Sequence, residues 1–174
     1  LDLWTRRHCG ERYDRQGSWA ASGQVLPKLL DHLLSDDYFS LSGPRSTGKE
    51  TFNLEWLDAR LTQFEGSDPS DIQATLAELT AASIANAIGN SSLAVDEIYV
   101  CGGGAHNADL LGRLDKRLPG AALKSTAALG IEPGWVEAVT FAWLAHRTVS
   151  GLAGNAPAVT GAIGERVLGA VYPG

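Results

Sequence analysis

The sequence has few of the features that place a protein in a membrane, in a disulfide framework or around zinc. No window approaches the roughly 20 apolar residues that a membrane span requires, and the first residues lack the plan of a signal peptide. The two cysteines, Cys9 and Cys101, are too few and too far apart for a disulfide framework or a zinc site. The four histidines show no metal-ligand spacing. We therefore expect a cytoplasmic protein with free thiols and no metal ligands.

Basic charge is also scarce. The net charge is −6, and the charged residues are scattered rather than gathered in a stripe, so nucleic acid is an unfavourable partner. The length of 174 residues, with 44% hydrophobic and 20% charged residues, is typical of one ordinary folded domain. The composition therefore predicts one compact core.

Apolar periodicity predicts a helix-rich α/β fold. The second half alternates helix and strand, which favours parallel strands with helices packed against them. Two strands make a poor sheet for three large helices, so we expect further strands upstream of Leu1. A buried strand is expected to end at Cys101, and a boundary lies at residues 66–70. The predicted helices cover residues 1–8, 18–34 with an interruption at Pro27, 53–61, 71–88 after a cap at Asp68 or Ser70, 107–118 and 133–150, and the predicted strands cover 97–101 and 121–124.

The turn between the strand at 97–101 and the following helix contains Gly102, Gly103 and Gly104. Glycines let the backbone come close to a flat base or a phosphate, and a helix N-terminus adds free N–H donors. The alternative is a tight strand-to-helix turn with Asn107 as the N-cap. The local sequence favours a ligand site but is compatible with both interpretations.

The segment from Gly43 to Glu50 has the G-x-x-x-x-G-K spacing of a phosphate-binding P-loop. A P-loop needs Ser or Thr after the lysine to bind Mg²⁺, whereas Glu50 follows Lys49 here. The preceding residues 38–41 also give only a weak signal for the strand that should come before a P-loop. A P-loop is therefore unfavourable, although Ser46, Thr47 and Lys49 could face a substrate. If this hypothesis were correct, Lys49→Ala should abolish ATP binding.

Glu137 lies in a helix whose nearby residues are almost all apolar or small. It could complement the helix dipole in the first turn after Pro133. It could instead point into a polar cleft, where a carboxylate would bind a sugar or transfer a proton. The local sequence leaves both interpretations open. Tyr13, beside Asp14, and the tryptophans Trp19 and Trp56 could stack on a sugar ring, but the helical spacing of the tryptophans favours the core.

The glycine turn also carries a family resemblance. Its strand-Gly-Gly-Gly-Ala-x-Asn pattern matches the adenosine-binding motif of the sugar kinase, hexokinase, actin and Hsp70 superfamily. Further strings closely resemble the anhydro-N-acetylmuramic acid kinase family, in the family's order and across essentially the whole chain. These strings are residues 13–14, 17–23, 46–53, 71–80, 135–138 and 159–162.

The resemblance implies an ATP- and Mg²⁺-dependent enzyme of peptidoglycan recycling. Such a kinase opens the 1,6-anhydro ring of anhydro-N-acetylmuramic acid with water and phosphorylates its 6-oxygen, giving N-acetylmuramic acid 6-phosphate. The implied fold is a ribonuclease-H-like, actin-like ATPase C-terminal domain, truncated at its opening strands, with a homodimer formed through it. Residues 1–66 would be a helical substrate-side region, and residues 67–174 an α/β nucleotide-binding core.

The resemblance also assigns site residues. Gly102, Gly103, Gly104 and Asn107 would line the adenosine and inner phosphates, and Glu137 would face the sugar near the anhydro bond as a catalytic and substrate-binding residue.

The chain departs from the family pattern at its front. The family's general base is an aspartate in an Asp-Thr-Gly-Pro segment, and no such segment occurs in these residues. Asp2 and Asp14 are the nearest acids, but neither has that context. We therefore expect the base and an N-terminal domain upstream of Leu1, and no turnover by this chain alone. The alternative is a noncatalytic nucleotide-binding or assembly module of the same superfamily.

Overall fold

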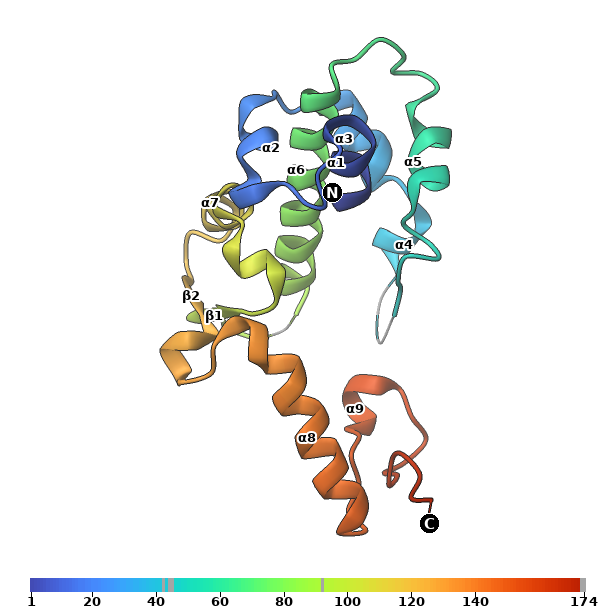
Figure 1. Cartoon of the computed structure of the whole chain (residues 1–174), viewed down its shortest axis with the longest axis vertical. Coiled ribbons are helices and arrows are strands. Elements are labelled where there is room, and N and C mark those ends of the chain that lie inside the picture. Colours follow the sequence, from blue (N-terminus) through green and yellow to red (C-terminus); the bar gives the residue numbers. More distant parts are fainter. Residues whose placement is uncertain (42, 44–45, 92, 173–174) are drawn as a thin grey trace.

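The fold consists of helices packed around one long central helix, with a small parallel sheet beside it (Figure 1). The computed structural model describes residues 1–41, 43, 46–91 and 93–172. Within these ranges, no helix combines the length and the apolar character that crossing a bilayer requires. The central helix is α6 (Pro69–Gly89), and it begins where the Asp68 side chain accepts the N–H of Ser70. Of the two caps predicted for this helix, Asp68 is the one that forms.

The helices before α6 follow the predicted pattern with two refinements. The predicted helix at 18–34 is divided, because Pro27 has no N–H to donate and starts a new helix. The predicted loop at 35–53 contains a short helix. The side chain of Asn53 caps the helix that was predicted at 53–61, by accepting the N–H of Trp56. The elements are α1 (Asp2–Cys9), η1 (Arg15–Gly17), α2 (Ser18–Ser22), α3 (Pro27–Leu34), α4 (Asp37–Ser40) and α5 (Leu54–Leu61).

The main core lies between α6 and the helices α1, α3 and α5. Leu29 and Leu33 of α3 are completely buried in it. Trp19 and Trp56 are partly buried and pack against this core, as the helical spacing predicted. The other buried members are Trp4, Leu57, Ile72, Leu76 and Leu79.

The sheet has two parallel strands, β1 (Glu97–Val100) and β2 (Ala122–Ser125). They are joined through η2 (Gly103–His106) and α7 (Ala108–Arg117), which confirms the predicted strand-helix-strand order. The prediction that β1 is buried was wrong. Glu97 is exposed, the other three β1 residues are only half-buried, and Cys101 just after the strand is exposed, because the described residues supply just two strands.

The helix α8 (Val136–Val149) has no buried residue and extends away from the helices around α6 (Figure 1). Trp135 at its start is 66% exposed and Phe141 is 65% exposed. An exposed apolar surface of this kind is characteristic of an interface. The neighbouring short elements are η3 (Thr126–Leu129), η4 (Pro133–Trp135) and α9 (Pro157–Thr160).

An ion-pair network joins α7 to α6. Glu78 accepts hydrogen bonds from Arg113 at 2.8 Å and from Arg117 at 2.6 Å, and Arg113 also binds Asp109 at 2.7 Å. The side chains of Glu78 and Arg113 are 16% and 13% exposed, so water screens their attraction only weakly. Burial alone would raise the pKa of Glu78, but the hydrogen bonds and charges of Arg113 and Arg117 outweigh it and hold the pKa below its ordinary value.

The network predicts a loss of stability in acid. Because the pKa of Glu78 is lower in the folded chain than in the unfolded chain, the carboxylate stabilises the fold above about pH 4.5, and this contribution disappears as the pH falls through the folded-state pKa. Glu78→Gln should lower the free energy of unfolding at pH 7 by about 1 to 3 kcal/mol and flatten its dependence on pH below 5. Urea unfolding between pH 3 and 7 measures both effects. Glu65→Gln, at an exposed position with no described ion pair, is the control; equal pH curves for both variants would contradict the prediction.

Candidate functional site

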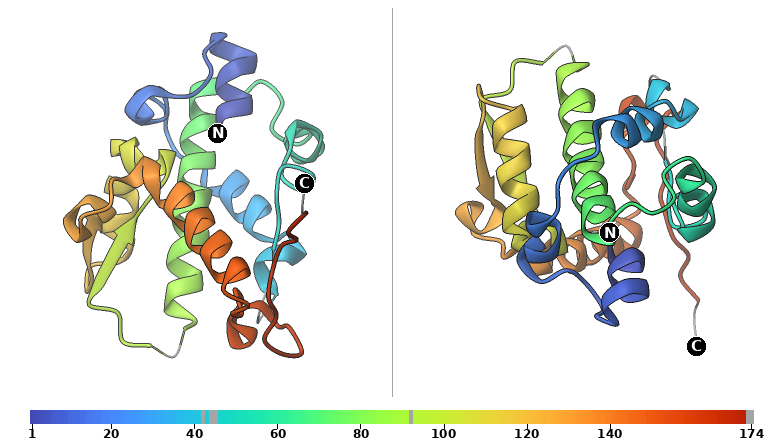
Figure 2. Two further views of the ribbon diagram at one scale, coloured as in Figure 1. Left: turned by 60° about the horizontal axis from the view of Figure 1, so that its bottom comes forward. Right: turned by 90° about the horizontal axis from the view of Figure 1, so that it is seen from above.

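A long groove runs across α6 and joins two segments that the sequence analysis considered separately. Its volume is 1270 Å³. Leu76, Leu79, Thr80 and Ser83 of α6 contribute to its lining, and we call it the α6 groove. Figures 1 and 2 show α5 and α7 on opposite sides of α6, so the groove has a wall on each side. One wall contains Gly103, Gly104, His106 and Asn107, and the other contains Tyr38, Phe39, Thr47, Lys49, Phe52, Asn53 and Trp56.

The glycine turn presents bare backbone to the groove. Gly102 has φ 69° and ψ −168°, a conformation essentially confined to glycine. A Cβ atom on Gly103 would meet nothing within 4 Å. The N–H groups of Gly103 and Gly104 donate to no carbonyl among the described residues. A ligand could therefore come within contact distance of this backbone and accept its hydrogen bonds.

Asn107 has the structural role that was predicted as the alternative to ligand binding. Its Oδ1 accepts the N–H of Leu110 at 2.9 Å, which caps α7. The same residue lines the groove, and its Nδ2 donates to no other described residue. The cap therefore fixes the side chain while its amide nitrogen is left for a ligand.

The turn of η1 packs directly against this motif, a contact that the sequence analysis missed. Gly17 is buried with φ 72°. A Cβ atom there would overlap Oδ1 of Asn107 and lie 2.7 Å from Cβ of Asp109. The only local signal was the position of Gly17 at a helix start, and this signal does not identify Asn107 as the residue that packs against it. The first region of the chain thus helps to hold Asn107 in place.

Asp14 lines the groove but has a structural role. Its carboxylate is buried and accepts the N–H groups of Trp19 and Ala20, each at 2.9 Å. Gln73 of α6 also donates to it at 3.4 Å. A carboxylate held by these donors caps the start of α2 and is not placed as a free base.

The segment at residues 43–50 lacks the context of a P-loop. Residues 38–40 belong to the helix α4 rather than to a strand, and the residues after Lys49 form a turn rather than a helix. Pro44 and Arg45 lie outside the described residues. A P-loop needs both flanking elements, so that interpretation does not hold. Thr47 and Lys49 nevertheless line the groove, whereas Ser46 does not.

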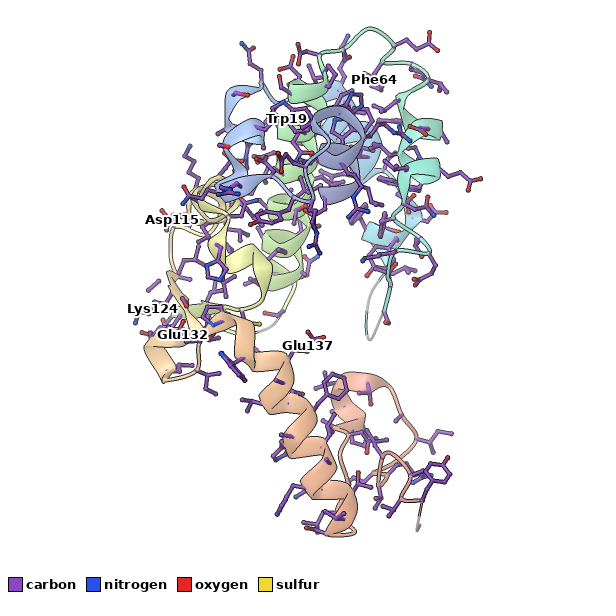
Figure 3. The ribbon with its side chains drawn as sticks, in the orientation of Figure 1. Trp19, Phe64, Asp115, Lys124, Glu132 and Glu137 are labelled. Atoms are coloured by element: carbon purple, nitrogen blue, oxygen red, sulfur yellow. The ribbon has the colours of Figure 1, made fainter. Side chains whose placement is uncertain are left out.

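Glu137 lies in the first turn of α8, exposed to solvent and away from the helix axis (Figure 3). It is not part of the groove's lining and makes no hydrogen bond or ion pair with a described residue. However, the N–H of Gly102 donates to the carbonyl of Pro133 at 2.9 Å, which fixes the start of α8 beside the glycine turn. The role of Glu137 toward a sugar stays a prediction.

Within the described residues, no group of three or more His, Cys, Asp or Glu side chains is placed to hold a metal ion. Mg²⁺ at a phosphate-transfer site needs only one or two carboxylates, because the phosphates and water supply its other ligands. An ion carried by a nucleotide therefore does not require such a group.

Several groove residues were not identified from the sequence, namely Arg6, Arg12, Tyr38, Phe39, Phe52, Thr80 and Ser83. A signal was present for Thr80 and Ser83. They are polar residues three apart in a largely apolar helix, and that spacing places them on one face.

The sequence matches a family model described as "Anhydro-N-acetylmuramic acid kinase" over residues 1–174. A protein with this name from Pseudomonas fluorescens (strain Pf0-1) is 52% identical over 173 residues, covering 99% of this chain and 48% of the relative. Another from Chromohalobacter salexigens is 54% identical over 178 residues, covering 100% of this chain and 47% of the relative. A third from Thiobacillus denitrificans is 51% identical over 174 residues. The chain spans about half the length of the curated relatives it matches.

Proposed function

Because the chain belongs to the anhydro-N-acetylmuramic acid kinase family, we propose that it forms the C-terminal part of an ATP-dependent sugar kinase. The complete enzyme would open the 1,6-anhydro ring of anhydro-N-acetylmuramic acid with water, phosphorylate its 6-oxygen and release N-acetylmuramic acid 6-phosphate for peptidoglycan recycling in the cytoplasm. The observation that carries the proposal is the α6 groove, since its two walls offer space for two substrates side by side.

The nucleotide would occupy the wall formed by the glycine turn. Gly102, Gly103 and Gly104 would contact the adenosine and inner phosphates, and Asn107 would donate from its free amide nitrogen. The open space above Gly103 and the unpaired N–H groups support this placement. Mg²⁺ would arrive on the phosphates, where it would neutralise charge during the transfer.

The sugar would occupy the opposite wall, so that residues 1–66 form the substrate side and residues 67–174 the nucleotide-binding core. Glu137 would approach the anhydro bond of the sugar from the glycine-turn side, where the two ligands meet, because the Gly102–Pro133 hydrogen bond holds the start of α8 beside that turn. Asp14 is unsuited to act as the general base, since its carboxylate already accepts two backbone N–H groups. The base would come from the family's Asp-Thr-Gly-Pro segment, which these residues do not contain.

The ribonuclease-H-like fold is part of the same proposal. The parallel pair β1 and β2 with α7 between them would be one portion of that sheet. The remaining half of the relatives' length would supply further strands and cover α8, whose apolar side chains have no cover among the described residues. A homodimer through this domain would use the apolar surface that the remaining half of the protein leaves exposed.

A direct test compares binding with turnover. The chain alone should bind ATP but phosphorylate no anhydro sugar, because a missing general base alone costs about 10² to 10⁴ in rate. When the chain is joined to the half of the relatives' length that it does not cover, the joined protein should produce sugar 6-phosphate. Turnover by the chain alone would contradict the proposal. ATP binding without turnover in the joined protein would favour the noncatalytic module instead.

A further inference from the structure

We infer that Lys49 binds the carboxylate of the sugar substrate, at the wall of the α6 groove opposite the glycine turn. The inference rests on the proposed function, because it takes the second ligand to be a muramic acid derivative. Such a sugar carries a carboxylate on its lactyl ether, a group that the corresponding N-acetylglucosamine derivative lacks. A site that distinguishes the two sugars must therefore contain a hydrogen-bond donor for this carboxylate, and a cation is the strongest such donor.

The charge of the groove suits an acidic ligand. Among the described residues that line it, Arg6, Arg12 and Lys49 are cationic, whereas Asp2 and Asp14 are acidic. The three cations form no ion pair with any described residue. The Asp14 carboxylate is already hydrogen-bonded to two backbone N–H groups. The groove is thus locally positive on a chain whose net charge is −6.

Lys49 is the cation that lies beside an aromatic wall. The ring of Phe52 stacks on that of Phe39 with ring centroids 5.5 Å apart. It makes T-shaped contacts with Tyr38 and Trp56, with ring centroids 5.1 Å and 4.9 Å apart. All four rings line the groove and are half-buried. Aromatic rings with partly exposed faces are suited to the apolar face of a sugar ring.

This wall is fixed by hydrogen bonds. Asp36 accepts Trp56 Nε1 at 2.9 Å and Arg60 at 2.7 Å, and these donors keep the pKa of Asp36 below its ordinary value despite its partial burial. Asn53 donates to the carbonyl of Glu50 at 3.1 Å and closes the turn that carries Lys49. The lysine backbone is therefore held in place before any ligand binds, which reduces the entropy lost on binding.

A nucleotide phosphate could also attract Lys49, and the geometry favours the sugar. Lys49 belongs to the wall that contains the aromatic rings, whereas the unpaired backbone donors belong to the wall across α6. A base and its inner phosphates at the glycine turn would leave the aromatic wall for the second substrate. Thr80 and Ser83 lie on α6, where the two ligands would meet.

The test measures binding of two matched sugars to the chain by calorimetry, anhydro-N-acetylmuramic acid and 1,6-anhydro-N-acetylglucosamine. The unchanged chain should prefer the acidic sugar by about tenfold or more, since a charged hydrogen bond distinguishes the two. Lys49→Gln should remove most of this preference, and Lys49→Arg should keep it. ATP affinity should be the same in all three proteins.

Lys28→Gln is the matched control, because Lys28 is exposed on α3 and does not line the groove. It should leave the preference intact. An unchanged preference in Lys49→Gln, or no binding of the acidic sugar, would overturn the inference while ATP binding at the glycine turn could still stand. A parallel loss of ATP affinity would also overturn it and would assign Lys49 to the phosphates.

Discussion

Replacing Gly103 with valine is expected to weaken ATP binding by at least about 100-fold while leaving the fold intact. The backbone of Gly103 does not need a positive φ, and a Cβ atom there meets nothing within 4 Å. The valine side chain would therefore be tolerated by the protein and would extend into the groove where the nucleotide is proposed to lie. Loss of close backbone contact and of the adjacent N–H hydrogen bonds accounts for the size of the effect.

The control is Gly120→Val. Gly120 also has open space around its Cβ position and no positive φ, but it does not line the groove. Calorimetric titration with ATP gives the affinities, and thermal unfolding shows whether each variant is folded. Both variants should unfold within a few degrees of the parent chain. Unchanged ATP affinity in folded Gly103→Val would place the nucleotide elsewhere.

Gly17→Ala is expected to lower the free energy of unfolding by about 2 to 5 kcal/mol. The left-handed backbone costs alanine about 1 to 2 kcal/mol. The overlap of its Cβ with Asn107 and Asp109 adds a further penalty of about 1 to 3 kcal/mol, as for an overpacked core. For a chain of this length the melting temperature should fall by roughly 4 to 20 °C. ATP binding should also weaken, because Asn107 must move.

Gly10→Ala separates the two causes. Gly10 has φ 73°, nearly the value of Gly17, but a Cβ atom there meets nothing within 4 Å. Its substitution should cost only the backbone strain and leave ATP affinity unchanged. If the two variants were equally stable and bound ATP equally well, the proposed contact between η1 and the glycine turn would have no effect on the site.

The sequence predicted those elements whose signals are local. The helix α6 was recognised because its own residues encode an apolar face and the aspartate directly before them caps it. The parallel pair β1 and β2 was recognised because two apolar segments flank a helix and a glycine turn. The predicted burial of β1 failed, since burial depends on which neighbouring strands are present.

The groove could not be predicted in the same way, because distant segments form it. Gly17 and Asn107 meet although 90 positions separate them, and nothing in either local pattern identifies the other. The P-loop hypothesis failed for a related reason. Its spacing was present around Lys49, but the strand and helix that give the motif its phosphate-binding geometry were not.

The placement of the nucleotide can be tested by NMR titration of ¹⁵N-labelled chain with ATP and Mg²⁺. The competing site is a smaller hollow of 320 Å³ lined by β1, α7 and β2, which includes Asp115 and Lys124 (Figure 3). The proposed function predicts the largest amide shift changes at Gly103, Gly104 and Asn107. Unchanged signals at these residues, with the largest changes around Asp115 and Lys124, would contradict it.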